Sequence, residues 1–383
     1  MYEVRCYIGD GDSSGLCYWA SLGPMVQCAG WVALVTGGKA GRPSSVGAMD
    51  NYEIQKTEPR GSYGFVHIVK RINDGRTFAM KVVEFMDEAT ANRAVEEAMI
   101  MLKLDHPNIC HYEEIFVSWD HEVSAVTVCM VMDYSPVGDL ASVIQTKRQM
   151  KGKIREMVIK NFLGQMVDVL IYLKSKHVIH RNLKPTNIQM LADLSFTICD
   201  FIFPTFVGDE VKFKIRMKDY SKVWMAPEAL KRRLLAKSDI WSLGCILLEM
   251  MTCNMMDANE FEQVVRIIRS NWKHLKFLLG KLHVEKKYTN SLCNLVQLML
   301  EPDPAERISA MSLLDLQYVK ESLVICGSTL SGIKKVPVGT ELLPFREGID
   351  KLLEFMLLQV DVEEIQKISL KYIIYLLYEA EGK

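Results

Sequence analysis

The spacing of apolar and polar residues divides the chain into a strand-rich part followed by a helical part. Residues 52–55 and 65–69 alternate with a period of two, which is typical of half-buried strands. The sequence Asn-Asp-Gly at residues 73–75 predicts a hairpin turn into a third strand at residues 77–83. A further pair of strands is predicted between residues 114 and 133.

Helical periodicity dominates the second part. One helix is predicted within the strand-rich part, at residues 89–104, and Asp139 is positioned to cap a helix that begins at Leu140. The other predicted helices cover residues 154–176, 237–253, 261–279, 289–300 and 309–316. A small strand-rich lobe before a larger helical lobe predicts an α+β fold with two lobes.

The first 49 residues do not share this pattern. They show no helical or strand period, and their most apolar piece, residues 17–35, is interrupted by Gly23, Pro24 and Gly30. We therefore predict that residues 1–49 form a disordered leader. A membrane anchor is the minority alternative, because the apolar piece is interrupted and no basic cluster precedes it.

The last segment, residues 322–383, has a helical pattern of its own. Residues 348–358 are amphipathic, and residues 362–378 predict a second apolar helix. A helical hairpin this apolar needs a covering surface. Either it packs on the helical lobe, or it is the first unit of a helical-repeat array.

Composition narrows the classes of partner. The chain has 383 residues and a formal net charge of −1, which gives no support to nucleic acid or an anionic membrane as a partner. None of the ten cysteines lies in a C-x-x-C pair, so a zinc site or a redox dithiol is disfavoured. Scattered reduced cysteines are typical of a cytoplasmic or nuclear protein, not of a secreted one.

Several short motifs follow one another along both parts. They are R-G-S-Y-G-F-V at 60–66, F-A-M-K at 78–81, V-M-D-Y at 131–134, H-R-N-L-K-P-T-N at 180–187, C-D-F-I at 199–202, A-P-E at 226–228 and D-I-W-S-L-G at 239–244. In this order, residues 50–321 resemble the protein kinase family. The resemblance implies a bilobal kinase fold with an N-lobe at 50–133 and a C-lobe at 134–321. It also implies ATP and Mg²⁺ as ligands and proteins as substrates or partners.

The resemblance places a glycine-rich loop over the ATP phosphates. Gly61, Gly64 and Val66 belong to this loop, where glycine lets backbone N–H groups approach phosphate oxygens. The family has a third glycine where this chain has Pro59, which lacks an N–H and has a fixed φ. The loop is therefore expected to be stiffer and to offer one donor fewer.

A lysine and a glutamate follow at the family's spacing. Ala79 and Lys81 match the strand whose lysine holds the α- and β-phosphates. Glu97 is the expected ion-pair partner of Lys81, and Glu96 is the alternative if the register differs by one residue. At isolated positions such charges usually lie on the surface, but here the motif favours an ion pair.

The next motif implies the adenine site. Met132, Asp133 and Tyr134 match the hinge between the lobes, where the resemblance puts backbone groups against the adenine edge. Met132 would lie at the back of the pocket. Gln189 replaces the apolar residue that the family places under the adenine ring, which weakens that contact.

The catalytic loop carries the largest departure. The family has an aspartate that orients the substrate hydroxyl and accepts its proton, and this chain has Asn182, which is neutral. Lys184 matches the lysine that neutralises the transferring phosphate. Asn187 and Asp200 match the Mg²⁺ ligands. Ile202 replaces the glycine after Asp200-Phe201, which restricts the backbone there.

Two smaller features leave alternatives open. Residues 211–218 alternate apolar and basic side chains, which predicts either a solvated basic face, slightly favoured, or a docking strand for an acidic partner. Glu228 of the A-P-E motif is expected to pair with Arg307, because residues 300–307 match the helix end from which the family supplies an arginine.

Three functions agree with these residues. The first is a pseudokinase that binds ATP but transfers phosphate poorly or not at all, and the second is a serine/threonine kinase of low turnover. The third is a protein-interaction scaffold that binds no nucleotide. Four retained residues argue against the third function: Lys81, Glu97, Asn187 and Asp200. The departures at Asn182, Ile202 and Pro59 argue against the second. The sequence therefore favours the pseudokinase.

Overall fold

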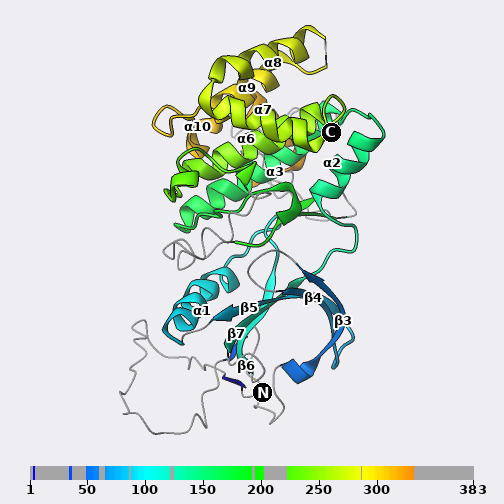
Figure 1. Ribbon diagram of the computed structural model, residues 1–383, viewed down its shortest axis with the longest axis vertical. Coiled ribbons are helices and arrows are strands. Elements are labelled where there is room, and N and C mark those ends of the chain that lie inside the picture. Colours follow the sequence, from blue (N-terminus) through cyan, green and yellow to red (C-terminus); the bar gives the residue numbers. More distant parts are fainter. Residues whose placement is uncertain are drawn as a thin grey trace, which may run out of the picture.

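The computed structural model describes residues 3–4, 34–36, 49–59, 65–85, 88–120, 125–191, 195–201, 222–285 and 287–331. A strand-rich lobe lies below a helical lobe along the long axis of the molecule (Figure 1). The predicted α+β fold with two lobes is therefore confirmed.

The N-lobe is built on an antiparallel sheet whose strands follow the order β6-β7-β5-β4-β3. These strands are β3 (Tyr52–Pro59), β4 (Phe65–Arg71), β5 (Thr77–Phe85), β6 (Tyr112–Asp120) and β7 (Ala125–Asp133). The predicted hairpin turn joins β4 to β5, and Gly75 there has a φ of 70°. Glycine adopts this left-handed conformation without a steric penalty, so the turn fits its sequence.

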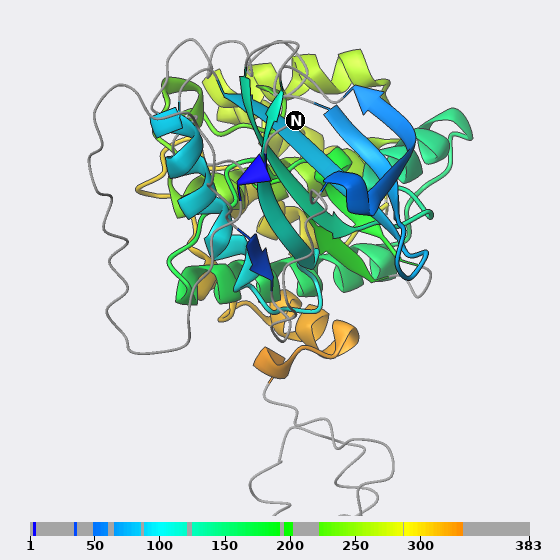
Figure 2. The same ribbon diagram turned by 90° about the horizontal axis from the view of Figure 1, so that it is seen from below.

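Helix α1 (Glu88–Leu102) lies beside the sheet (Figures 1 and 2). Its buried face is made of Ala91, Ala94, Ala98 and Met101, which recur at helical spacing. Small side chains at this face allow the helix backbone to approach the sheet closely. The prediction of a helix at 89–104 is confirmed, with its end at residue 102.

Two short strands of the N-terminal segment lie on the edge of this sheet. Strands β1 (Glu3–Val4) and β2 (Leu34–Thr36) both pair antiparallel with β6. The sequence predicted no strand in residues 1–49, and at these two places the structure differs. The edge of β6 presents unpaired backbone N–H and C=O groups, which any extended backbone can pair with regardless of its side-chain pattern. The rest of the predicted leader up to residue 48 lies outside the described residues.

The C-lobe is helical. Its helices are α2 (Leu140–Gln149), α3 (Glu156–Ser175), α6 (Ala236–Thr252), α7 (Ala258–Ser270), α8 (Trp272–Val284), α9 (Asn290–Met299), α10 (Ala310–Leu313) and α11 (Gln317–Cys326). Asp139 caps α2 as predicted, because its Oδ1 accepts the backbone N–H of Ser142 at 2.8 Å. Helix α6 is buried along almost its whole length and forms the centre of the lobe.

Two predicted helices have different ends in the structure. The single helix predicted at 261–279 is two helices, α7 and α8, which are separated at Asn271 by a φ of −138° and a ψ of 87°. Asparagine competes for backbone hydrogen bonds and so favours helix ends. The helix predicted at 309–316 is the short α10. The predicted domain boundary at 321 falls inside α11, and residues 332–383 lie outside the described residues.

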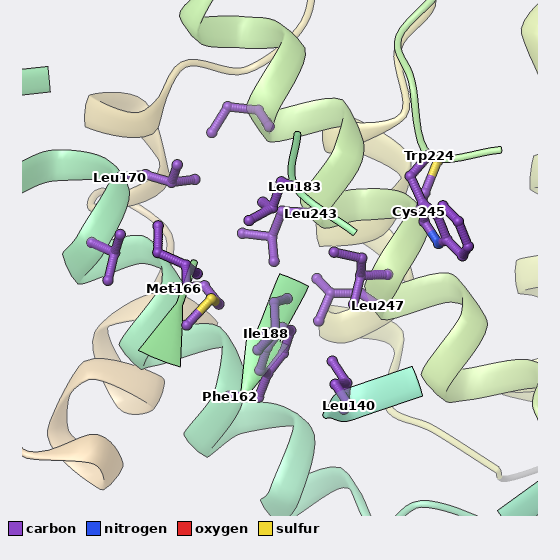
Figure 3. Packing of buried hydrophobic residues seen from close by; sticks show 14 of the residues in the cluster. Leu140, Phe162, Met166, Leu170, Leu183, Ile188, Trp224, Leu243, Cys245 and Leu247 are labelled. Atoms are coloured by element: carbon purple, nitrogen blue, oxygen red, sulfur yellow. The ribbon is translucent and has the colours of Figure 1, made fainter. Parts of the chain in front are cut away.

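The catalytic-loop region sits on the core of the C-lobe. Figure 3 shows Leu183 and Ile188 between side chains of α3 and of α6, among them Met166 and Leu243. Leu183 and Ile188 are both buried. Two apolar anchors therefore fix the loop between them, residues 183–188, on the helical core.

Helices α3 and α11 pack in direct backbone contact. A Cβ added to Gly164 of α3 would lie 2.2 Å from the carbonyl oxygen of Ser322 in α11 and 2.8 Å from Cys326 Sγ. Only glycine fits such an approach without moving the backbone. No helix within the described residues is long and apolar enough to cross a membrane.

We predict that Gly164→Ala destabilises the protein by about 1–3 kcal/mol, because the new methyl group forces α11 away from α3. Gly280→Ala is the matched control. Gly280 lies inside α8, and an added Cβ would meet nothing within 4 Å. Alanine there should stabilise by about 0.5–1 kcal/mol through its higher helix propensity. Urea unfolding followed by circular dichroism measures both changes, and equal effects would contradict the packing argument.

Candidate active site

A small hairpin brings two predicted site residues together. Strand β8 (Ile188–Met190) pairs antiparallel with β9 (Phe196–Ile198), with Ile188 opposite Ile198. Asn187 precedes β8 and Asp200 follows β9, so both lie at the same end of the hairpin. The N–H of Cys199 donates to the carbonyl of Asn187 at 2.9 Å, which fixes this end.

The same hairpin ties the lobes together. The N–H of Ile198 donates to the carbonyl of Asn108 at 2.9 Å, and Cys110 returns a bond to Ile198 at 2.9 Å. The buried Asn108 amide also donates to Phe196 O at 2.9 Å and to Gln165 Oε1 at 2.7 Å. Buried amides fully paired in this way hold one arrangement of the segments.

A buried carboxylate holds the start of the catalytic loop. Asp239, near the start of α6, accepts the backbone N–H of His180 at 2.8 Å and that of Arg181 at 3.0 Å. Arg181 has a φ of 65°, a left-handed conformation that costs a non-glycine residue about 1–2 kcal/mol. Burial raises the pKa of Asp239 to about 6, although both hydrogen bonds oppose the shift.

Asn182 contacts the predicted metal ligand directly. Its side-chain Nδ2 donates to Asp200 Oδ2 at 2.8 Å and to the carbonyl of Asp200 at 3.0 Å. The other carboxylate oxygen, Oδ1, is paired with the ammonium of Lys81. Asp200 has a φ of 63°, so its backbone is also in the left-handed region. An aspartate at residue 182 has no N–H to donate and would face Asp200 with a second negative charge.

Neighbouring contacts fix the residues on either side of this pair. Asn187 Nδ2 donates to the carbonyl of Asn182 at 2.8 Å. Phe201 is buried with its ring 4.4 Å from the ring of His180, and His180 Nε2 lies 3.0 Å from Cys199 O. The residues before and after Asp200 are therefore held by the same loop that carries Asn182.

The nucleotide-side residues of β4, β5 and β7 lie in register. Val66 is opposite Lys81 in the β4–β5 pair, and Ala79 is opposite Met132 in the β5–β7 pair. Ala79 and Met132 are buried, and Val66 packs against the same core. Together they provide the apolar surface next to a lysine that an ATP site requires.

The predicted hinge residues lie at the end of β7. Asp133 and Tyr134 are exposed, as expected for residues between the lobes. The N–H of Asp133 donates to His111 O at 3.0 Å, and the Cys110 thiol donates to Asp133 O at 3.4 Å. The remaining acceptor capacity of the Asp133 carbonyl is what an adenine amine could use.

Some predicted site residues remain untested. Gly61, Gly64 and Ile202 lie outside the described residues, as do residues 211–218. Lys184, two residues after Asn182 in the sequence, is half-buried.

The Lys81–Glu97 ion pair also stays a prediction. Lys81 forms its ion pair with Asp200. Glu97 is half-buried on α1, whereas Glu96 is exposed. Glu97 lies near Arg181, whose pKa is lowered by burial while the carboxylates of Asp239 and Glu97 oppose that shift.

Two residues near the site were not found from the sequence. Tyr112 is buried, and its pKa is raised well above the usual value, first by burial and also by the nearby negative charge of Asp200. Ser135 donates its hydroxyl to the carbonyl of Met190 at 2.8 Å, which joins the hinge to β8. A tyrosine in a strand and a serine after one are common, so neither carried a signal.

The predicted Glu228–Arg307 pair is confirmed. Arg307 Nη1 lies 2.6 Å from Glu228 Oε1, Nη2 lies 3.0 Å from Oε2, and both side chains are buried. Burial raises the pKa of Glu228, but the bonds from Arg307 outweigh this and the net shift is downward. A bidentate pair of this kind fixes the end of the segment that follows the site.

The donor set fits a magnesium ion in its chemistry. Asp200 offers a carboxylate, and Asn187 offers its carbonyl oxygen because its amide nitrogen is bonded to Asn182. Mg²⁺ prefers such oxygen ligands and usually adds waters and substrate phosphates to one or two carboxylates. Within the described residues no group of three or more His, Cys, Asp or Glu side chains could form a cage by itself.

The family model for the protein kinase domain matches residues 52–319. The chain belongs to the protein kinase family. The match covers every described element from β3 to α10, so the kinase domain includes both lobes and the site between them.

Relatives among the curated proteins include serine/threonine kinases. Over 284 residues the chain is 31% identical to mouse (Mus musculus) serine/threonine-protein kinase Nek4, covering 71% of this chain and 33% of that protein. Over 270 residues it is 29% identical to mouse Nek3, covering 70% of this chain and 49% of that protein. Human (Homo sapiens) Nek2 is 32% identical over 220 residues, which are 54% of this chain and 47% of that protein. The match thus spans half or less of each relative's length.

The buried Asp239 predicts a pH-dependent stability. A carboxyl group whose pKa is about 6 when folded and about 3.9 when unfolded binds more protons in the folded state between these values. Its contribution to the free energy of unfolding therefore falls by about 2–3 kcal/mol as the pH rises from about 4 to about 6. Asp239→Asn should remove this slope.

Urea unfolding at a series of pH values tests the prediction. The control is Asp257→Asn at the exposed N-cap of α7, where asparagine caps a helix as well as aspartate does. Wild type should lose stability relative to Asp239→Asn as the pH rises from about 4 to about 6. Asp257→Asn should lose stability relative to Asp239→Asn in the same range, because it keeps the carboxyl group of Asp239. Parallel curves for wild type and Asp239→Asn would show that the carboxyl group keeps its ordinary pKa.

Proposed function

We propose that this kinase domain binds ATP with Mg²⁺ and transfers the γ-phosphate poorly or not at all, so that it works as a pseudokinase. The single observation that carries the proposal is the Asn182 side chain, whose amide donates to Asp200 at 2.8 Å. The residue in the position of the base is a hydrogen-bond donor turned toward the metal ligand.

The chemistry of the amide supports lost phosphate transfer. A carboxylate accepts the proton of the substrate hydroxyl, whereas an amide nitrogen has no free lone pair to accept it. Loss of a general base lowers a rate by about 10²–10⁴, which is about 3–5 kcal/mol of barrier. Lys184 can still neutralise the transferring phosphate, so a residual rate is compatible with the proposal.

The charged contacts of the nucleotide side support ATP binding. Lys81 and Asp200 are already paired in the site, and Asn187 stands beside them at the end of the β8–β9 hairpin. Val66, Ala79 and Met132 add the apolar surface. Retained binding without transfer suits a domain that responds to nucleotide by changing its contacts with protein partners.

Two alternatives are distinguished by experiment. The first alternative is a working kinase that phosphorylates serine and threonine in proteins, which is the class named for the curated relatives. Asn182 in the position of the base would make its turnover low. A scaffold without nucleotide binding would leave the charged residues of the site without a ligand. The two measurements below separate these three functions.

The first prediction concerns ATP. At about a hundredfold excess over its dissociation constant, ATP with Mg²⁺ should stabilise the full chain by about 2.7 kcal/mol, a shift of several degrees in Tm. Lys81→Met should lose the shift, because the phosphates lose their ammonium partner. The control Lys320→Met, at an exposed position on α11, should keep it. Absence of a shift in wild type would favour the scaffold.

The second prediction concerns phosphate transfer. Asn182→Asp restores the base and should raise the rate on a serine/threonine peptide library by about 10²–10⁴ over wild type. The double variant Asn182→Asp with Asp200→Asn lacks the metal ligand and shows whether the activity arises at this site. Wild type as fast as Asn182→Asp would identify a working kinase and reject the pseudokinase.

A further inference from the structure

Both carboxylate oxygens of Asp200 have partners from the chain itself. Oδ1 is paired with Lys81, and Oδ2 accepts the Asn182 amide at 2.8 Å. The same amide also reaches the backbone carbonyl of Asp200 at 3.0 Å. Lys81 and Asp200 are each largely shielded from water, with 14% and 26% of their side chains exposed. The carboxylate is thus satisfied by one cation and one neutral donor.

An aspartate in place of Asn182 would create the opposite situation. Its carboxylate would lie about 3 Å from that of Asp200, and two negative charges at this distance repel strongly unless a cation lies between them. The neutral amide removes this repulsion and turns it into an attraction. With Asn182 there is therefore no second carboxylate whose repulsion a divalent cation would have to screen. The Asp200 carboxylate already has Lys81 and Asn182 as partners.

The difference in charge between Asn182 and an aspartate also favours nucleotide binding without a divalent cation. Asn182 is neutral, so it adds no negative charge next to Lys81, Lys184 and Asp200. An aspartate at 182 would add one. A site with one negative charge fewer favours the uncomplexed nucleotide, which is more negative than its magnesium complex.

We infer that Asn182 allows this site to bind a free nucleoside triphosphate without a divalent cation. This inference rests on the proposed function, since it concerns the same nucleotide site. Asn182 acts here as a positioning residue: it holds Asp200 in the left-handed conformation that the structure shows, and Lys81 completes the arrangement. Mg²⁺ can still bind through Asp200 and Asn187, but it is not required for nucleotide affinity.

Calorimetric titration of the full chain with ATP tests the inference. One series contains excess EDTA and the other contains millimolar Mg²⁺. We expect the dissociation constant of wild type to differ by less than about threefold between the two series. Asn182→Asp should bind about tenfold or more weakly in EDTA than in Mg²⁺, because its paired carboxylates repel the phosphates when no cation is present.

The control is Asn290→Asp. Asn290 is exposed in the first turn of α9, where a carboxylate is tolerated, so this variant changes the total charge equally but outside the site. It should behave as wild type in both series. Equal cation dependence in Asn182→Asp and Asn290→Asp would show that Asn182 does not determine it, and would overturn the inference.

The wild-type titration distinguishes failure of the cation-independent binding from failure of nucleotide binding itself. It does not depend on whether a variant folds. ATP binding in Mg²⁺ but not in EDTA would overturn the inference and leave the proposed function intact. Absence of binding in both series would reject nucleotide binding itself, and the inference with it. Binding of similar strength in both series is the result expected.

Discussion

The hydrogen bonds from the backbone of His180 and Arg181 to the buried carboxylate of Asp239 are the constraint on which the site depends. They attach the start of the catalytic loop to α6, the most buried helix of the C-lobe. Leu183 and Ile188 then pin the rest of the loop into the core (Figure 3). Because β8 begins where this loop ends, the loop fixes the position of the β8–β9 hairpin. Asp200, which follows β9, is positioned by the hairpin in turn.

The second constraint is the electrostatic contact between the side chains of Asn182 and Asp200. A carboxylate and an amide of nearly equal size differ at residue 182 only in charge and in what they can donate. That difference decides whether Asp200 meets a repelling or an attracting neighbour. Lys81 crosses from the N-lobe to complete the contact, so this one carboxylate joins β5 of the N-lobe to the catalytic loop of the C-lobe.

The sequence predicted the two lobes better than the contacts inside the candidate site. Periodicity located the five main strands and most helices, because one face of each is buried. It missed the break at Asn271, since the apolar period of α7 continues into α8. It also missed β1 and β2, whose pairing comes from backbone groups alone. The motifs singled out Asn182 and Asp200 as candidate site residues. No motif indicates that the amide of Asn182 turns toward the carboxylate of Asp200.

The contact with Asn182 also stabilises the left-handed backbone conformation of Asp200. A φ of 63° lies in the left-handed region, which aspartate adopts more readily than most other side chains, and the amide that binds both its carboxylate and its carbonyl stabilises this conformation. An aspartate at residue 182 would act during the transfer of phosphate. The asparagine acts in the resting protein. At this position the chain carries an amide that stabilises the ground-state conformation of Asp200.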